Sequence, residues 1–222
     1  MIDNFDTIEN NLLEFEKGTY YKFEALVRNT DGCNSLYHKG VSKTNKNILI
    51  KTWWIDTEEY YQRMKNEMKT LCDMTNARLY VLLDRKSLRR TLTEISKIST
   101  QLMIQSYVYG SMDPDVSAVH KISGSASSVN VSSERGKRMW MFDVDSDDFR
   151  LLQEIQNVCY PHKFFTLRTK KGYHVCVTKE GFKKPNADYL GTYLYEHRDE
   201  WSVQGNAMGL VYMPDKVALR GV

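Results

Sequence analysis

The chain has 222 residues, of which 41% are hydrophobic and 27% are charged, and its formal net charge at pH 7 is +3. This length can build one large domain or two small ones, and no apolar run approaches the roughly 20 residues needed to cross a bilayer. Met1–Asn4 lack the basic and then apolar pattern of a signal peptide. We therefore expect a soluble, intracellular, cytoplasmic protein with no membrane partner, whose small net charge leaves room for a local basic patch.

The four cysteines are scattered along the chain, at Cys33, Cys72, Cys159 and Cys176. They form no C-x-x-C pair and have no histidine at the spacing of zinc ligands. The sequence therefore predicts free thiols in a reducing compartment and no zinc site.

The N-terminal part, to about residue 122, alternates strand and helix signals. Ile48–Trp54 predicts a strand, and Asp56 with Glu59 forms a capping box that opens a helix. The apolar residues of that helix recur at helical spacing, at Tyr61, Met64, Met68, Leu71 and Cys72. Leu79–Leu83 predicts a second strand, and apolar residues mark a second helix at Leu88, Leu92, Ile95 and Leu102. This β-α-β-α order predicts an α/β module.

A basic segment lies between the second strand and the second helix of this module. It contains Arg85, Lys86, Arg89 and Arg90 within six residues. Cations at the start of a helix can hold backbone phosphates, so the segment predicts a nucleic-acid track. The alternative is an ordinary solvated helix start.

One stretch is low in complexity, the Ser- and Gly-rich segment 123–136. It predicts a flexible loop that separates the N-terminal module, 1–122, from a C-terminal core, 137–222, within a single catalytic unit.

The C-terminal core has the most regular pattern of the chain. Its predicted elements are a strand over Trp140–Asp145, a helix over Asp148–Cys159, a strand over Lys163–Arg168, a turn over Thr169–Gly172, a strand over Tyr173–Thr178, a helix over Asn186–Glu200 and a strand over Ala207–Met213. The order β-α-β-β-α-β predicts a ferredoxin-like unit and, with the first module, an α+β fold.

The first of these strands ends in two carboxylates, Asp143 and Asp145. Residues two positions apart on a strand share a face, so the two side chains would repel each other unless a cation lies between them. Mg²⁺ takes one or two protein carboxylates and completes its shell with water and phosphate oxygens. The pattern therefore indicates phosphate chemistry. The alternative is a strand that runs into a helix, with Asp147 and Asp148 as caps.

The ferredoxin-like topology brings further groups to these carboxylates. Its first and third strands are antiparallel neighbours, so Asp145 would lie beside the start of the strand that carries His174. The hairpin Thr169–Gly172 emerges at the same edge. Lys170, Lys171 and His174 could hold a triphosphate there, and Gly172 would let the backbone approach it. The alternatives are a buried, hydrogen-bonded histidine and a solvated hairpin.

The sequence Met-Phe-Asp143-Val-Asp145, followed later by Gly172-Tyr173-His174, resembles the archaeo-eukaryotic primase superfamily, also called primase–polymerases. The resemblance covers mainly residues 137–215. It implies an RRM-like catalytic core behind an N-terminal α/β module. It also implies template-directed transfer from nucleoside triphosphates on single-stranded DNA, with Mg²⁺ or Mn²⁺ on Asp143 and Asp145 and with His174 as a catalytic, nucleotide-binding residue. The chain has no zinc-binding or helicase segment, so a helicase or other replication protein is an expected partner.

The family usually has a third metal carboxylate on a late strand, and this sequence departs from that pattern. Asp215 follows the last predicted strand, whose end should lie at the opposite edge from Asp145. Asp199 and Glu200 are better placed but lie on a predicted helix. Without a third carboxylate, the fold could be retained with altered catalysis.

Two other functions compete with this interpretation. A non-enzymatic RRM-like nucleic-acid-binding domain would need Phe142, Tyr173 and Val175 to face outward and stack on bases, whereas metal catalysis needs the alternate residues outward. A phosphatase with Asp143 as nucleophile would need a doubly wound domain, and too little chain follows residue 143 to build one.

Overall fold

The computed structural model describes residues 1–28, 47–108, 122, 126, 138–178 and 191–215. Within them, the protein is a mixed α and β structure in which every strand pairing is antiparallel. The predicted loop 123–136, apart from Ala126, and the first residues of the predicted helix over Asn186–Glu200 lie outside the described residues. In the described part of the chain, no helix is both long enough and apolar enough to cross a membrane.

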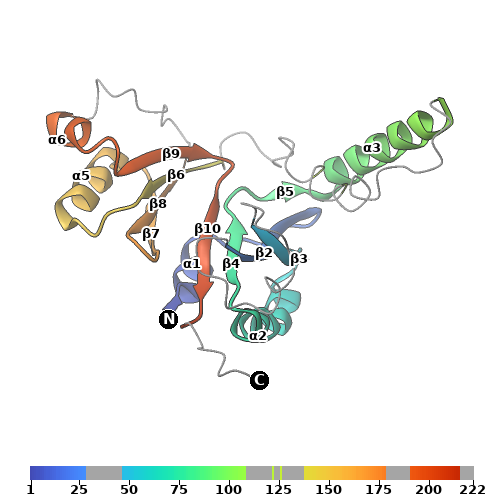
Figure 1. Cartoon of the computed structure of the whole chain (residues 1–222), viewed down its shortest axis with the longest axis horizontal. Helices are drawn as coiled ribbons and strands as arrows, with labels where there is room; N and C mark the ends of the chain where they lie inside the picture. The colour runs from blue at the N-terminus through green and yellow to red at the C-terminus, as the bar shows by residue number, and fades with distance from the viewer. Residues whose placement is uncertain (29–46, 109–121, 123–125, 127–137, 179–190, 216–222) are drawn as a thin grey trace.

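The first sheet has the order β1-β10-β4-β2-β3, and β5 pairs with β2. Its strands are β1 (Ile2–Asp3), β2 (Thr19–Val27), β3 (Ile48–Ile55), β4 (Arg78–Leu82), β5 (Lys86–Ser87) and β10 (Met208–Met213). The helices α1 (Phe5–Asn11) and α2 (Glu58–Thr75) cover one face, while α3 (Leu88–Val108) projects from the body (Figure 1). The strand β2 and the helix α1 were not predicted, although β2 lies near the centre of this sheet.

The helix α2 begins one residue later than the predicted capping box. Thr57 is the N-cap, and its side chain accepts a hydrogen bond from the Tyr60 N–H at 3.3 Å. Glu58 and Glu59 follow in the first turn, where negative charge favours the helix dipole. Asn76 ends the helix in a left-handed conformation, φ 51°. The cap is therefore Thr57 and not Asp56.

The second sheet has the order β7-β8-β6-β9. Its strands are β6 (Met139–Val144), β7 (Phe164–Arg168), β8 (Tyr173–Thr178) and β9 (Trp201–Gly205), and its helices are α5 (Phe149–Cys159) and α6 (Gly191–Glu196). Both helices pack on one face, around a core that includes Phe142, Val144, Ile155 and Val175. Asp148 is the N-cap of α5, as the capping alternative expected, and its side chain accepts from the Arg150 N–H at 2.8 Å.

The prediction that Ala207–Met213 closes the C-terminal unit is wrong. The fourth strand of the second sheet is β9, which pairs with β6, and the chain then crosses to the first sheet as β10 (Figure 1). The sequences of the two strands explain the difference. Trp-Ser-Val-Gln-Gly alternates apolar and polar residues, as a half-exposed edge strand does, whereas Met-Gly-Leu-Val-Tyr-Met is almost continuously apolar and occupies a buried position between two strands.

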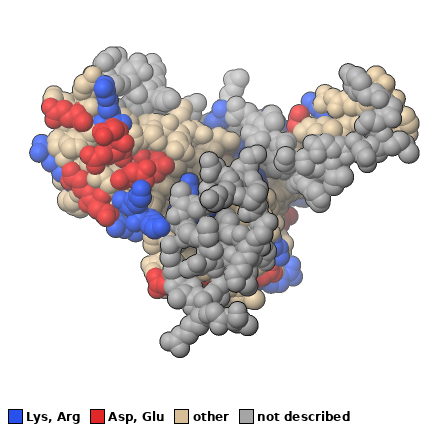
Figure 2. Space-filling view, in the orientation of Figure 1, with Lys and Arg blue, Asp and Glu red and all other residues tan. Residues whose placement is uncertain are grey.

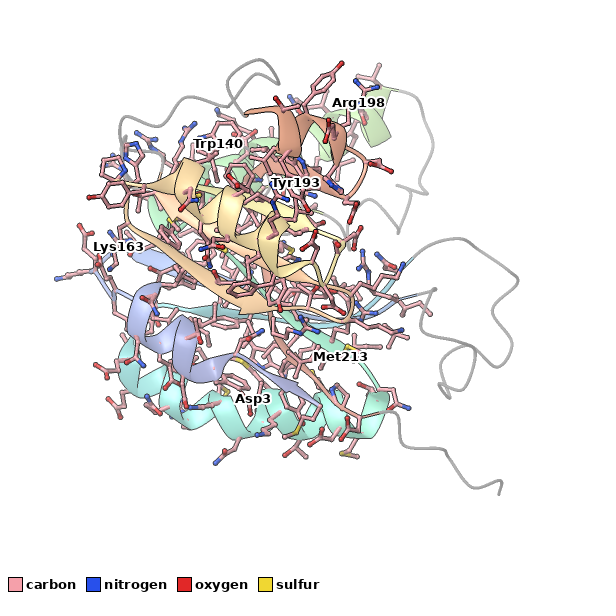
Figure 3. The ribbon with its side chains drawn as sticks, turned by 90° about the vertical axis from the view of Figure 1, so that its left-hand side faces the viewer. Asp3, Trp140, Lys163, Tyr193, Arg198 and Met213 are labelled. Carbon is pink, nitrogen blue, oxygen red and sulfur yellow. The ribbon has the colours of Figure 1, made fainter. Side chains whose placement is uncertain are left out.

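The second sheet turns its other face toward the first sheet. One core cluster contains residues of both sheets. It includes Met141, Leu167 and Cys176 from this face, together with Leu83, which follows β4, and Val211 of β10. Figure 3 shows α1 and α2 on the side of Asp3, and Tyr193 and Arg198 with α6 on the far side. The two sheets therefore form the inner layers of one body, with helices outside.

Candidate active site

A cleft of about 670 Å³ lies between the two sheets. The second sheet contributes Asp143, Asp145 and His174 to its lining, and the hairpin before β8 contributes Lys170 and Lys171. The structure thus brings together all five of these predicted side chains, which come from two strand ends and one turn. Their assembly in one cleft agrees with the predicted geometry, and their roles remain predictions.

The position of Asp143 follows from the alternation of side chains along β6. Phe142 and Val144 point toward the helices, so Asp143 and Met141 point toward the first sheet. Asp143 is the direct cross-strand partner of His174 on β8 and of Ser202 on β9.

Two side chains hold the Asp143 carboxylate. His174 Nε2 lies 3.3 Å from Oδ1, and the Gln204 amide donates to Oδ2 at 3.3 Å. The hydrogen bond with His174 holds the pKa of Asp143 below its usual value, and nearby Arg28 and Gln204 lower that pKa further, while burial opposes them. The carboxylate is therefore ionised at neutral pH and can attract a cation.

His174 is buried and still lines the cleft, with 10% of its side chain exposed. The Leu210 N–H of β10 donates to Nδ1 at 3.3 Å. Because Nδ1 accepts this bond, the proton of a neutral ring is assigned to Nε2, which faces Asp143. The first sheet thus fixes the orientation of a histidine that belongs to the second.

Asp145 lies just beyond the end of β6 and is exposed. Its backbone N–H donates to the Glu200 carbonyl at 2.8 Å, which ties the residue to the start of β9. Asp143 and Asp145 suit Mg²⁺, which takes one or two protein carboxylates and leaves other positions for water and phosphate oxygens. Among the residues that the structure describes, no group of three or more His, Cys, Asp or Glu side chains is arranged to hold a metal.

The residues considered for a third carboxylate are engaged elsewhere or lie off the cleft. Ser146 and His197 donate hydrogen bonds that lower the pKa of Glu200, and the His197 Nδ1–Glu200 distance is 2.7 Å. Asp215 pairs with the N-terminal ammonium of Met1. The helix α6 ends at Glu196, so Asp199 and Glu200 lie after it and not on it. At the β9 positions beside Asp143, the sequence places the neutral Ser202 and Gln204.

The hairpin before β8 packs tightly on the end of β6. The Thr169 N–H donates to the Gly172 carbonyl at 2.9 Å, and the Gly172 N–H donates to Thr169 Oγ1 at 3.1 Å. A Cβ on Gly172 would lie 2.1 Å from the Val144 carbonyl oxygen and 2.6 Å from that of Ser146. The close approach that requires glycine here is therefore to the strand that carries the carboxylates.

Arg85 and Lys86, the first two residues of the predicted nucleic-acid track, are buried and bound to other parts of the chain. Arg85 is buried, donating to the Glu14 carbonyl and to the Glu16 carboxylate, both at 2.7 Å. Lys86 is completely buried and donates to Asn206 Oδ1 at 2.6 Å. These two cations bind other parts of the chain, and Lys86 belongs to β5, so neither lies on a solvated helix start. Arg89 and Arg90 are exposed at the start of α3 and do not line the cleft.

The first sheet forms the opposite wall of the cleft, which sequence reasoning missed. Arg28, at the end of β2, Arg78 and Tyr80 on β4, and Leu210 on β10 line this wall. The apolar and aromatic pattern of β2 is the signal that could have found it. Figure 2 shows acidic and basic side chains mixed over the α5 and α6 part of the surface.

The two competing functions do not fit this geometry. Phe142 and Val175 are fully buried and Tyr173 packs against the same cluster under α5 and α6, so they cannot form a base-stacking platform. The doubly wound phosphatase needs a parallel sheet, and every described pairing is antiparallel.

A comparison with models of known protein families finds no match, and neither do comparisons with curated proteins and with solved structures.

Proposed function

We propose that this protein is a template-directed nucleotidyltransferase of the primase–polymerase type, which acts on nucleoside triphosphates and a single-stranded DNA template. One observation carries the proposal. The carboxylate of Asp143 lies 3.3 Å from His174, in a cleft that Asp145, Lys170 and Lys171 also line. Phosphoryl transfer depends mainly on positioning and on charge neutralisation, and this cleft offers groups for both.

Each group has a proposed role in that reaction. Asp143 and Asp145 would hold Mg²⁺ or Mn²⁺, which supplies charge neutralisation for the attacking hydroxyl and the leaving pyrophosphate. Lys170 and Lys171 are exposed on the hairpin and bind the triphosphate. His174 donates from Nε2, which faces the cleft, and so contacts either Asp143 or a phosphate oxygen.

The arrangement of the second sheet supports the same class of protein. The order β7-β8-β6-β9, with a helix after the first strand of the unit and another before the fourth, supports the proposal of a ferredoxin-like or RRM-like unit. We infer that this unit is the catalytic core and that the first sheet backs it. A helicase or other replication protein is the partner that such an enzyme would need.

The experiment is a primer-synthesis and primer-extension assay on single-stranded DNA with Mg²⁺ or Mn²⁺. We expect wild-type activity and no incorporation by D143N/D145N, because removing both charges removes the cation's ligands. D147N is the matched control, since Asp147 is exposed and pairs with Arg168 at 2.7 Å on the surface. It should keep full activity.

Circular dichroism and thermal unfolding would establish that the variants are folded. Full activity in D143N/D145N would contradict the metal assignment, and inactive wild type under all these conditions would contradict the proposed function.

A further inference from the structure

A completely buried lysine, Lys86, lies where the two sheets join, and the proposed chemistry does not use it. Lysine is almost never fully buried without a partner, because its ammonium group loses its hydration. Burial lowers the pKa of Lys86, while Asp84 raises it and Arg138 and Lys22 lower it. A lysine side chain buried in such surroundings needs a hydrogen-bond partner to offset its lost hydration.

The contact is with the connection between the two sheets. Lys86 Nζ donates to Asn206 Oδ1 at 2.6 Å. Asn206 stands between β9 and β10 in a left-handed conformation, φ 54°, and lines the cleft. Gln204, two residues earlier, donates to Asp143, and Leu210, four residues later, donates to His174. The connection that Lys86 contacts therefore joins the two strands that contact the Asp143–His174 pair, β9 through Gln204 and β10 through Leu210.

The residues beside Lys86 bind the same region. The Leu83 N–H donates to the Ala207 carbonyl at 3.0 Å. Asp84 Oδ1 accepts from the Met139 N–H at 2.8 Å, at the start of β6. The segment 83–86 thus joins the first sheet to the beginning of the carboxylate-bearing strand and to the β9–β10 connection.

We propose that Lys86 is a positioning residue of the cleft. Through Asn206 it fixes the β9–β10 connection, and it thereby aligns Gln204 with Asp143 and the Leu210 N–H with His174. An apolar side chain of similar volume would avoid the desolvation of a buried charge, but it could not make a directional bond to Asn206. The expected effect of a Lys86 substitution on primer extension rests on the proposed function, whereas its expected effect on the order of the β9–β10 connection does not.

The test compares K86M, N206G and K86M/N206G. Glycine suits the left-handed conformation at position 206, so N206G removes the amide with little backbone strain. Hydrogen exchange followed by mass spectrometry should show faster exchange at residues 207–210 in all three variants. Primer extension should fall about tenfold or more, because small misplacements of reacting groups are costly. K86M and N206G each remove the same hydrogen bond, between Lys86 and Asn206. The double variant should therefore lose no more activity than either single variant.

K22M is the matched control. Lys22 is also a buried lysine on the first sheet, but its ion pair, 2.6 Å to Glu24, stays within β2. K22M should destabilise the fold without selectively faster exchange at residues 207–210.

Unchanged exchange at residues 207–210 in K86M and N206G would overturn the inference, and so would exchange that accelerates equally throughout the chain. If K86M fails to fold, N206G decides the matter. If the wild-type protein does not extend primers, the proposed function fails, and the exchange measurements alone decide the role of Lys86.

Discussion

His174 and Gly172 lie two residues apart, and the position of each depends on contacts with neighbouring strands. His174 faces Asp143 because the two residues are register partners of β8 and β6. Its ring orientation depends on Leu210 of β10, in the other sheet. Gly172 lets the hairpin contact the end of β6. His174 therefore links Asp143 to β10, and Gly172 holds the hairpin against the end of β6, next to Asp145.

G172A should both destabilise the protein and lower its activity. The added Cβ would overlap the Val144 carbonyl, so the hairpin or the segment 144–146 has to move. Overpacking of this kind costs about 1–3 kcal/mol, which urea unfolding would measure. The displacement also moves Asp145, so primer extension should fall.

G18A is the control for that experiment. Gly18 has φ 81° and nothing within 4 Å of the position where a Cβ would be built, so its substitution introduces only backbone strain. G18A should lose stability and keep its activity. Equal activity of G172A and G18A would show that the contact at Gly172 does not position Asp145.

Asp148 makes the stability of the folded protein depend on pH in the acid range. The Tyr193 hydroxyl, 2.5 Å from Oδ2, and the Arg150 N–H hold its pKa below the usual value (Figure 3 labels Tyr193 beside α5). A carboxyl whose pKa is depressed in the folded state stabilises the fold above its unfolded pKa of about 3.9, and this stabilisation is lost as the pH falls through the folded pKa.

D148N should keep the cap of α5, because asparagine is an equally good N-cap, but it cannot titrate. Its unfolding temperature should therefore fall less than that of the wild type between pH about 4 and pH about 2. Thermal unfolding over this range measures the difference. Identical pH dependence in the two proteins would contradict the assigned role of Asp148.

At the scale of elements, local signals predicted β3, α2, β4, α3, β6, α5, β7 and β8 to within a few residues. Each has a clear period, as in the apolar face of α5 at Leu152, Ile155 and Cys159. The strands β2 and β9 were missed, although β2 has an apolar and aromatic pattern. The strand β10 was assigned to the wrong sheet, because which sheet a strand joins depends on the partners available to it. Arg28 directly follows the missed β2, so its place in the opposite wall of the cleft was missed with that strand.

The hairpin and the start of α3 should separate two kinds of binding. K170A/K171A should weaken nucleotide binding by about 1–3 kcal/mol, the range for charge-assisted hydrogen bonds, while single-stranded DNA affinity changes much less. R89Q/R90Q should weaken DNA binding and reduce its salt dependence, with a slope change of about 0.7 for each phosphate that the variant no longer neutralises.

Nucleotide titrations and DNA-binding measurements at matched salt would test both variants. R63Q, an exposed arginine on α2, is the control and should change neither affinity. If K170A/K171A bound DNA more weakly and bound nucleotide as tightly as the wild type, the two assignments would be the wrong way round.

At the scale of the whole molecule, the core that the two sheets share buries Cys72 and Cys176, and the core between the second sheet and its helices buries Cys159. Cys72, Cys159 and Cys176 are free and buried. Burial raises the pKa of Cys72 and of Cys159 to about 12, and it raises the pKa of Cys176 as well. Only the thiolate reacts, so these three thiols should resist alkylation at pH 8 until the protein unfolds.

Alkylation followed by peptide mapping, with and without urea, measures this resistance residue by residue. Cys176 faces the first sheet and Cys159 is on the buried face of α5, so the order of labelling reports which layer opens first. Rapid labelling of all three in the native protein would contradict the burial of these thiols in closed cores.

The sequence alone determined the pairing of Asp143 with His174, because strand period and the β-α-β-β order place them on neighbouring strands. It also predicted the hairpin beside them, and it offered Asp148, together with Asp147, as a helix cap. Only the tertiary structure decided which residues face the carboxylates across the cleft, why Arg85 and Lys86 are buried, and that Leu210 orients His174. These features depend on β10 crossing from one sheet to the other, and such long-range pairing leaves no local period in the sequence.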